Sequence, residues 1–225
     1  MHRTVQPRVL YFGTPVVVIS TANDDGSANL APMSSVWWVG RSCMLGLDET
    51  SRTTANLART GECVLNLPSS GLVGAVDRLA LLTGTPVVPE HKKRKGYRYE
   101  PDKFGAAGLT PLPSETVAPP RIAECPVHLE AVVERIHPFA EEDSGVVAVD
   151  ARIVRVHVEE ELLVPGRPHH LDADRWDPLI MKFCEFYGGG RNLHPSALAR
   201  GWDMPPRRTA PEASWNAGTP QPNSP

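Results

Sequence analysis

Short runs of apolar and β-branched residues alternate with turn residues through the first part of the chain. Residues 14–21 (TPVVVIST) have the composition of a strand, and the turn cluster after them contains Asp25-Gly26, a favoured hairpin turn. We expect a partner strand over residues 27–38, interrupted by Pro32, and a third strand over residues 42–47. Together they predict an antiparallel meander with the proline at an edge or a bulge, because proline cannot donate a ladder hydrogen bond.

Helical signals follow this meander. Residues 53–59 contain good helix formers, Ser51 is placed to cap their N-terminus, and Thr60-Gly61 is a C-cap signal. The apolar spacing of residues 72–82 predicts a second helix, capped by one of the two serines before it. Residues 196–200 predict a final short helical segment.

Further strands are predicted on both sides of a long loop. Residues 62–67 (ECVLNL) form the first, and residues 127–136 and 146–158 form two more, joined by an acidic turn. Residues 161–164 predict a short extra strand, whereas residues 83–124 are dense in glycine and proline and predict mainly loop. The pattern lacks the strand–helix alternation of a doubly wound fold and favours a mainly β, closed or partly closed antiparallel barrel with a few short inserted helices.

The length and composition agree with one globular domain. The chain has 225 residues, of which 41% are hydrophobic and 22% charged. We expect a single domain over residues 1–202 and a flexible tail over residues 203–225, which is rich in proline and has no apolar periodicity. The net charge of −3 gives no electrostatic support for nucleic-acid binding.

The compartment is predicted from what the chain lacks and from its cysteines. No apolar run is long enough for a membrane span, and no secretory signal leads the sequence. The four cysteines are far apart and form no C-x-x-C pair. We therefore expect a cytoplasmic protein with reduced, mostly buried thiols and no association with membranes.

Residues 29–35 (NLAPMSS) are the first candidate site. A proline within this strand breaks the ladder, so freed backbone groups can bond a planar heterocycle such as a flavin ring, while Ser34 and Ser35 supply hydroxyls. The alternative is an ordinary bulged edge strand.

Residues 48–56 (DETSRTTAN) are the second candidate site, between a strand and the start of a helix. A helix N-terminus attracts phosphate through its free N–H groups, and Arg52 adds a guanidinium. The hydroxyls of Ser51, Thr53 and Thr54 add further donors. The alternative is a simple capped helix.

Together these stretches resemble the flavin reductase-like family, whose members have an FMN-binding split barrel. The resemblance runs from about residue 14 to 198 and is carried, in this order, by PVVVISTANDDGSANLAPMSS, LGLDETSRTTANLARTGECVLNLPS, GYRYEPDKFGAAGL and HLDADRWDPLIMKF. It implies an antiparallel split β-barrel and a homodimer with FMN near the subunit interface. By this analogy, the flavin ring or ribityl chain is lined by Ala31, Pro32, Met33, Ser34 and Ser35, and the phosphate is held by Ser51, Arg52, Thr53, Thr54 and Asn56. Asn29 is a further predicted cofactor-binding residue.

The family is functionally mixed, so three hypotheses stay open. The first is an oxidoreductase, an NAD(P)H-dependent flavin reductase that supplies reduced flavin to a partner monooxygenase or uses it. The second is a non-enzymatic FMN-binding electron-transfer protein, and the third is a split barrel recruited to another biosynthetic reaction with a different cofactor. No catalytic side chain is predicted, because hydride transfer from NADH or NADPH to a flavin is carried by the cofactors.

Two charged features offer contacts for a second molecule. The basic run at residues 91–95 (HKKRK) can attract an additional phosphate, or it is a solvated loop face. His169 and His170, near Asp172 and Asp174, can orient a substrate. They predict no metal site, because adjacent histidines rarely share one ion and no third imidazole stands at a suitable spacing.

Aromatic residues suggest two further roles. Tyr97, Tyr99 and Phe104 alternate with cations in the long loop, which either closes one side of a flavin cleft or is only pinned to the barrel. Trp37 and Trp38 are adjacent on a predicted strand and point to opposite faces. We expect one to face the barrel and the other a second subunit.

Overall fold

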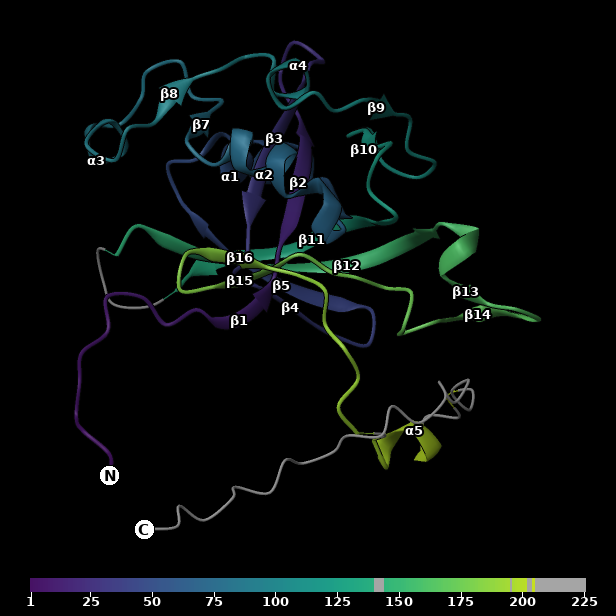
Figure 1. Cartoon of the computed structure of the whole chain (residues 1–225). Helices are drawn as coiled ribbons and strands as arrows, with labels where there is room; N and C mark the ends of the chain where they lie inside the picture. The colour runs from purple at the N-terminus through teal and green to yellow at the C-terminus, as the bar shows by residue number, and fades with distance from the viewer. Residues whose placement is uncertain (140–143, 195, 202–203, 205–225) are drawn as a thin grey trace.

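A computed structural model describes residues 1–139, 144–194, 196–201 and 204 (Figure 1). Its centre is a seven-stranded antiparallel sheet in the order β3-β2-β6-β11-β12-β5-β4. The strands are β2 (Val17–Ala22), β3 (Ala28–Met33), β4 (Val36–Val39), β5 (Ser42–Asp48), β6 (Glu62–Leu67), β11 (Val127–Pro138) and β12 (Val146–Val158). The prediction of a mainly β, antiparallel fold with short helices is confirmed.

The sheet is curled, and its two edges meet at Ser34-Ser35. β3 and β4 lie at opposite edges of the sheet although only these two residues join them. Met33 and Val36 are three residues apart and can be separated by at most about 10 Å, so the edges must approach each other there. The backbone N–H of Gly46 on β5 donates to the carbonyl oxygen of Ser35 at 2.8 Å. The single strand predicted over residues 27–38 is therefore wrong, since this segment is divided into β3 and β4 at opposite edges of the sheet, while Pro32 lies on an edge strand as expected.

Two apolar clusters pack against opposite faces of the sheet. Val17 and Ile19 of β2 point into the curl, with Leu45, Leu65 and others. Val18, between them on β2, points the other way, because side chains alternate along a strand. It belongs to the cluster that packs against the helices drawn above the sheet in Figure 1, α2 (Val73–Leu79) and α4 (Lys103–Ala107). The first three residues of β2 are all apolar because both of its faces are buried, and the next two, Ser20 and Thr21, are buried polar residues.

The first predicted helix is observed as α1 (Arg52–Thr60). The Oγ of Ser51 accepts a hydrogen bond from the backbone N–H of Thr54 at 3.0 Å, which is an N-cap. Gly61 ends the helix with φ of 68°, a left-handed conformation that favours glycine. Both predicted caps are confirmed.

The second predicted helix is shorter than expected. It consists of a 3-10 turn (Ser70–Leu72) followed by α2, and Leu82 belongs to β7 (Leu82–Thr83). β7 pairs in parallel with β8 (Arg98–Tyr99), so a tertiary contact ends the helix early. Within the predicted loop lie α3 (Glu90–Lys93), α4, β9 (Pro111–Leu112) and β10 (Arg121–Ile122).

The strand predicted over residues 14–21 is divided in two. β1 (Phe12–Pro15) leaves the main sheet and pairs with β15 (Ile180–Lys182), which forms a hairpin with β16 (Glu185–Tyr187). The break is at Val16, whose backbone N–H donates to the carbonyl oxygen of Leu179 at 2.9 Å. Sequence pattern missed this division because the apolar run of residues 16–19 continues from the break into β2.

The other predicted segments are the short strand at residues 161–164, the helical segment at residues 196–200, the acidic turn and the C-terminal tail. Residues 161–164 form a 3-10 turn (Glu160–Leu162) and a two-residue strand, β13 (Leu163–Val164), which pairs with the unpredicted β14 (Arg167–Leu171). α5 (Leu198–Gly201) forms at the predicted C-terminal helical segment. The predicted tail, apart from Met204, and most of the acidic turn lie outside the described residues.

Three of the four cysteines are buried thiols, as expected. Burial raises the pKa of the Cys43 thiol to about 11 and also raises those of Cys63 and Cys125. Cys184 differs, since it is exposed. In the described part of the chain, no helix combines the length and the apolar character that a membrane span requires.

Candidate functional site

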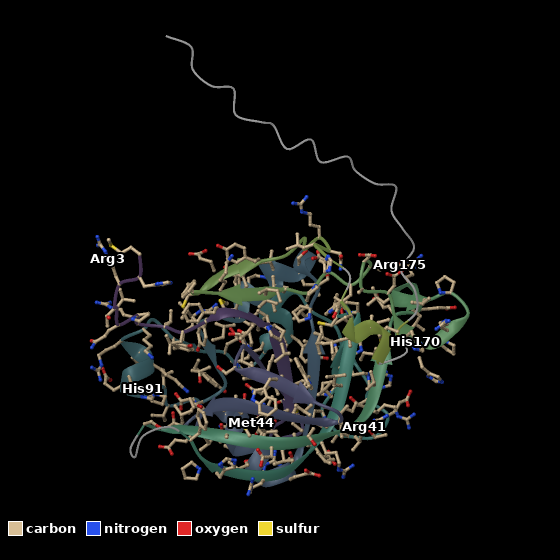
Figure 2. The ribbon with its side chains drawn as sticks, turned by 90° about the horizontal axis from the view of Figure 1, so that it is seen from below. Arg3, Arg41, Met44, His91, His170 and Arg175 are labelled. Atoms are coloured by element: carbon tan, nitrogen blue, oxygen red, sulfur yellow. The ribbon has the colours of Figure 1, made fainter. Side chains whose placement is uncertain are left out.

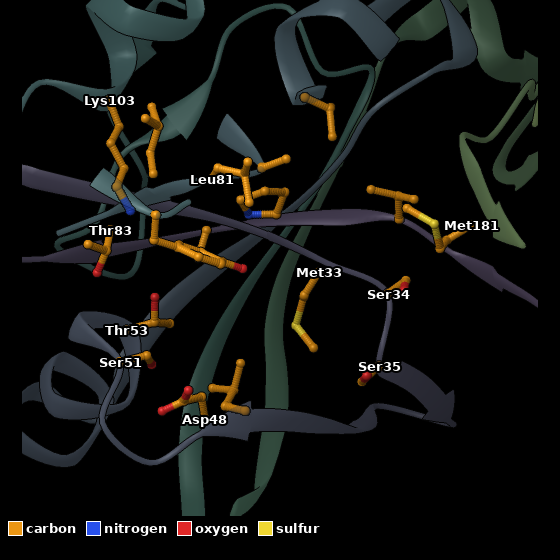
Figure 3. A pocket seen from close by; sticks show the side chains of 18 of the residues that line it. Met33, Ser34, Ser35, Asp48, Ser51, Thr53, Leu81, Thr83, Lys103 and Met181 are labelled. Atoms are coloured by element: carbon orange, nitrogen blue, oxygen red, sulfur yellow. The ribbon is translucent and has the colours of Figure 1, made fainter. Parts of the chain in front are cut away.

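A cavity of about 560 Å³ opens beside the seam where the two sheet edges meet (Figure 3). This volume is typical of sites for small molecules and cofactors, which measure roughly 300–1,000 Å³. Its walls come from β3 and the Ser34-Ser35 link, the end of β5, the start of α1, the end of α2 and the β15–β16 hairpin. Because β3 is an edge strand, its free backbone groups face this space rather than another strand.

The two ends of the cavity differ in chemistry. Figure 3 shows Ser51, Thr53, Thr83 and Lys103 gathered at one end. Met33, Ser34, Ser35 and Met181 lie at the other end. The cavity therefore has a polar, cationic end and a largely apolar end, and it fits an elongated molecule with an anionic group and an apolar ring.

The N-terminus of α1 forms part of the polar end. Arg52 is the first residue of this helix, and its Nε donates to the carbonyl oxygen of Gly84 at 3.1 Å. This bond fixes the guanidinium, whose terminal NH₂ groups form no hydrogen bond with the residues that the structure describes. A Cβ at Gly84 would lie 2.5 Å from Asn29 Oδ1 and 3.0 Å from Arg52 Cγ, so this contact requires glycine.

Asn29 has a buried acceptor without a partner. The side chain is 2% exposed, and its Nδ2 donates to Thr53 Oγ1 at 3.0 Å and to Thr21 Oγ1 at 3.3 Å. Its Oδ1 accepts no hydrogen bond from the described residues. An unsatisfied buried acceptor costs about 1–3 kcal/mol, so a donor on a bound molecule would relieve this cost. Asn29 lines the cavity, so its side chain is a candidate contact for a bound molecule.

Lys103 places a buried amine in the polar end. It is 3% exposed, and its Nζ donates to the carbonyl oxygen of Leu30 on β3 at 2.7 Å. Burial, reinforced by the charge of Lys92, lowers the pKa of Lys103 to about 8. No carboxylate forms an ion pair with this amine among the described residues. It is therefore a cation that an anionic ligand would stabilise.

Asp48 and Lys92 form a charge pair in the same wall. Lys92 Nζ lies 3.3 Å from Asp48 Oδ2, and His91 Nε2 lies 3.1 Å from the same oxygen. Burial pulls the pKa of Asp48 up, but hydrogen bonds from Thr50 and His91 and the charge of Lys92 outweigh it and hold the pKa at about 2. Asp48 is thus ionised at neutral pH, and its charge is compensated from within the protein.

Most of the sequence-predicted residues meet in this cavity. The predicted cofactor-binding residues that line it are Asn29, Ala31, Pro32, Met33, Ser34, Ser35, Ser51, Arg52 and Thr53. Tyr97, a predicted substrate contact from the long loop, also lines it.

Four predicted residues lie elsewhere. Thr54 and Asn56 are buried in α1 outside the cavity wall, where Thr54 Oγ1 donates to the carbonyl oxygen of Asp48 at 2.8 Å. Asn56 Nδ2 donates to Asn23 Oδ1 at 2.9 Å. These bonds orient the start of the helix. His169 and His170 lie on β14, and Figure 2 shows His170 at the opposite edge of the molecule from His91. No cluster of three or more metal-ligating side chains occurs in the described ranges.

Sequence reasoning missed several residues of the wall. Lys103 stands in the segment EPDKFGAAGL, and its interpretation as a loop cation gave no sign that it is buried. Gly84 and Thr83 come from the predicted loop, and Met181, Cys184 and Phe186 from a hairpin that was not predicted. The quoted family segments around Lys103 and Met181 were the signal that could have found them.

The family follows from comparison with known proteins. Residues 9–181 match the flavin reductase like domain. The chain belongs to the flavin reductase-like family. It is similar to the uncharacterized protein YdfE of Bacillus subtilis (strain 168), with 37% identity over 191 residues that cover 85% of this chain and 91% of that protein. It is also 27% identical to an uncharacterized protein of Methanothermobacter thermautotrophicus, over 74% of this chain and 73% of the relative.

Solved structures share the fold. The flavoredoxin of Desulfovibrio vulgaris (Miyazaki F) superposes with a TM-score of 0.72 at 22% identity, over 89% of this chain and all of that one. Nitrilotriacetate monooxygenase component B from Bacillus cereus gives 0.66 at 22% identity, over 82% and 88% of the two chains. A Shewanella frigidimarina protein with a split barrel domain gives 0.64 at 20% identity, over 82% and 87%. The predicted split-barrel fold is thereby confirmed.

Proposed function

We propose that the cavity binds FMN and that the protein is an NAD(P)H-dependent flavin reductase or a closely related FMN-dependent oxidoreductase. The observation that carries this proposal is the buried, unpartnered Oδ1 of Asn29 in the wall of a cavity that has a polar and an apolar end. FMN matches these ends, because a ribityl chain with hydroxyl donors separates its phosphate from its planar ring.

The polar end suits the phosphate. The start of α1 offers backbone N–H groups and the positive end of the helix dipole, and the hydroxyl of Thr53 and the guanidinium of Arg52 lie beside it. Lys103 contributes a further cation. A doubly charged phosphate there would be met by hydrogen-bond donors and positive charges.

The apolar end suits the flavin ring. Pro32, Met33 and Met181 present apolar surface, and the backbone of the Ser34-Ser35 link and the edge of β3 offer hydrogen-bonding groups. When bound, FMN supplies the hydride chemistry by accepting electrons from a reduced nicotinamide. The chain's own part is to hold the two rings in contact, at about 3–3.5 Å.

The proposal includes the oligomeric state of the protein and its cellular compartment. We propose a homodimer, supported by the exposed apolar surface of Trp37 and Val39 at the sheet edge, 54% and 68% exposed. Trp38 instead packs against the cluster inside the curl, so the two tryptophans do point to opposite faces. A partner monooxygenase is consistent with a relative that is a monooxygenase component. The free thiols support a cytoplasmic location.

The test begins with purified protein and two measurements. Absorbance spectra and fluorescence titration with FMN measure binding, and NADH or NADPH oxidation with added FMN measures turnover. We expect FMN to bind and its presence to be required for oxidation of the reduced nicotinamide.

Each alternative outcome selects another hypothesis. Tight FMN binding without oxidation of NADH or NADPH would favour the electron-transfer protein. Absence of FMN binding, with the protein folded, would contradict the proposal and favour a scaffold that uses another cofactor.

A further inference from the structure

The five basic residues 91–95 fall into two groups in the fold: some are paired with carboxylates and the others are not. His91 and Lys92 turn toward Asp48, as described above. Lys93 Nζ lies 3.8 Å from Glu90 Oε2, three residues earlier on α3. Three of the five basic side chains are therefore paired with carboxylates, which leaves the charges of Arg94 and Lys95.

Arg94 and Lys95 are uncompensated cations. Both are exposed, and neither side chain forms a hydrogen bond or ion pair with any residue in the described ranges. The next cation along the chain, Arg98, is 3.4 Å from Glu100. The positive charge of this surface is thus concentrated on two adjacent residues of a chain whose net charge is −3.

These two cations stand at the rim of the cavity. The backbone N–H of Tyr97 donates to the carbonyl oxygen of Lys92 at 3.1 Å, which closes a turn over residues 92–97. Gly96 permits this turn with φ of +87°. The side chains of Lys92 and Tyr97, at its two ends, both line the cavity. The tip of the turn therefore projects from the cavity wall into solvent.

We infer that Arg94 and Lys95 select a dinucleotide reductant that carries an additional phosphate, so that NADPH is used in preference to NADH. The inference rests on the proposed function, in which a reduced nicotinamide reaches the cavity from outside. The phosphate of FMN has its own donors inside the cavity, at the start of α1. Cations on the rim are left for a second anionic molecule, and the phosphomonoester on the adenosine ribose is the group that distinguishes NADPH from NADH.

A binding measurement tests the inference independently of turnover. Calorimetry on the FMN-loaded protein at low salt compares 2′,5′-ADP, which has this phosphomonoester, with 5′-AMP, which does not. We expect 2′,5′-ADP to bind about tenfold or more tightly, since a charge-assisted phosphate contact has this magnitude. The preference should weaken as salt rises, because exposed charges are screened.

Variants assign the preference to the two residues. In Arg94→Gln/Lys95→Gln, the preference for 2′,5′-ADP and the ratio of kcat/KM for NADPH over NADH should both fall about tenfold. Lys93→Gln is the matched control, since it removes a neighbouring cation that is already paired with Glu90, and it should retain the wild-type preference.

The outcomes separate this inference from the proposed function. Equal binding of the two nucleotides, or a double variant that keeps the wild-type preference, would overturn the inference even if NADH is oxidised rapidly. If neither NADH nor NADPH is oxidised, the proposed reductase activity is contradicted. The relative affinities for 2′,5′-ADP and 5′-AMP would then show by themselves whether the turn selects the additional phosphate.

Discussion

Lys103 Nζ donates a 2.7 Å hydrogen bond to the carbonyl oxygen of Leu30, on the free edge of β3. The bond joins α4, which lies within the predicted long loop, to the strand that lines the cavity. It therefore holds a buried amine at the polar end of the site, where the phosphate of FMN is proposed to bind.

Lys103→Met should weaken FMN binding about tenfold or more, because it removes a desolvated cation from the polar end of the cavity. The linear side chain of methionine keeps most of the buried volume, so the variant is expected to fold. Fluorescence titration gives the dissociation constant, and circular dichroism checks the fold. A folded variant with wild-type FMN affinity would show that Lys103 takes no part in binding.

FMN affinity of the wild type should fall as pH rises from 7 to 9. The pKa of Lys103 is lowered to about 8, so its amine is charged below that pH and progressively neutral above it. The same shift predicts that stability of the apo-protein is penalised at pH 7, where the buried amine is charged, and that this penalty is relieved between pH 8 and 10.5. In Lys103→Met, the affinity change centred near pH 8 should be absent.

Arg52→Ala should weaken FMN binding about ten- to a hundredfold, which corresponds to about 1.5–3 kcal/mol for a charge-assisted contact. Loss of the bond to Gly84 also removes one internal hydrogen bond, so a smaller decrease in melting temperature is expected. Arg59→Ala is the control on the same helix, since Arg59 pairs with Asp24 at the opposite end of α1. An unchanged FMN dissociation constant in Arg52→Ala would contradict the placement of the phosphate.

Tyr97→Ala should raise the Michaelis constant for NADH or NADPH several-fold while FMN occupancy stays close to that of wild type. Tyr97 is partly buried and lines the cavity, whereas Tyr99, two residues later, is 42% exposed and does not. Tyr99→Ala is therefore the matched control and should behave as wild type. If Tyr97→Ala only lowers the melting temperature, the long loop has a purely structural role.

Trp37→Glu should convert the proposed homodimer into a monomer, because it places a charge in exposed apolar surface at the sheet edge. Light scattering of the wild type should give about twice the chain mass of 24.5 kDa. Val87→Glu, a change at an exposed apolar residue of the loop, is the control. A wild-type monomer at micromolar concentration with FMN bound would contradict the dimer.

Local sequence determined those elements whose signals lie within a few residues. Ser51 and Gly61 delimit α1 because a hydroxyl and a left-handed glycine act on the adjacent helix ends. The long strands β11 and β12 were predicted because their apolar alternation extends over many residues. Both candidate stretches, 29–35 and 48–56, contribute to one cavity, as their composition suggested.

Tertiary structure decided what depends on distant partners. The separation of β3 from β4 is set by the curl of the whole sheet, and the local composition of residues 28–39 does not specify it. The β15–β16 hairpin and Lys103 enter the site from segments far along the chain, where their short elements are stabilised by packing rather than by local propensity. The sequence by itself therefore determined the long strands, the caps of α1 and the polar residues of the two candidate stretches. The fold decided which of these residues face one another across the cavity, because that depends on long-range pairing of sheet edges.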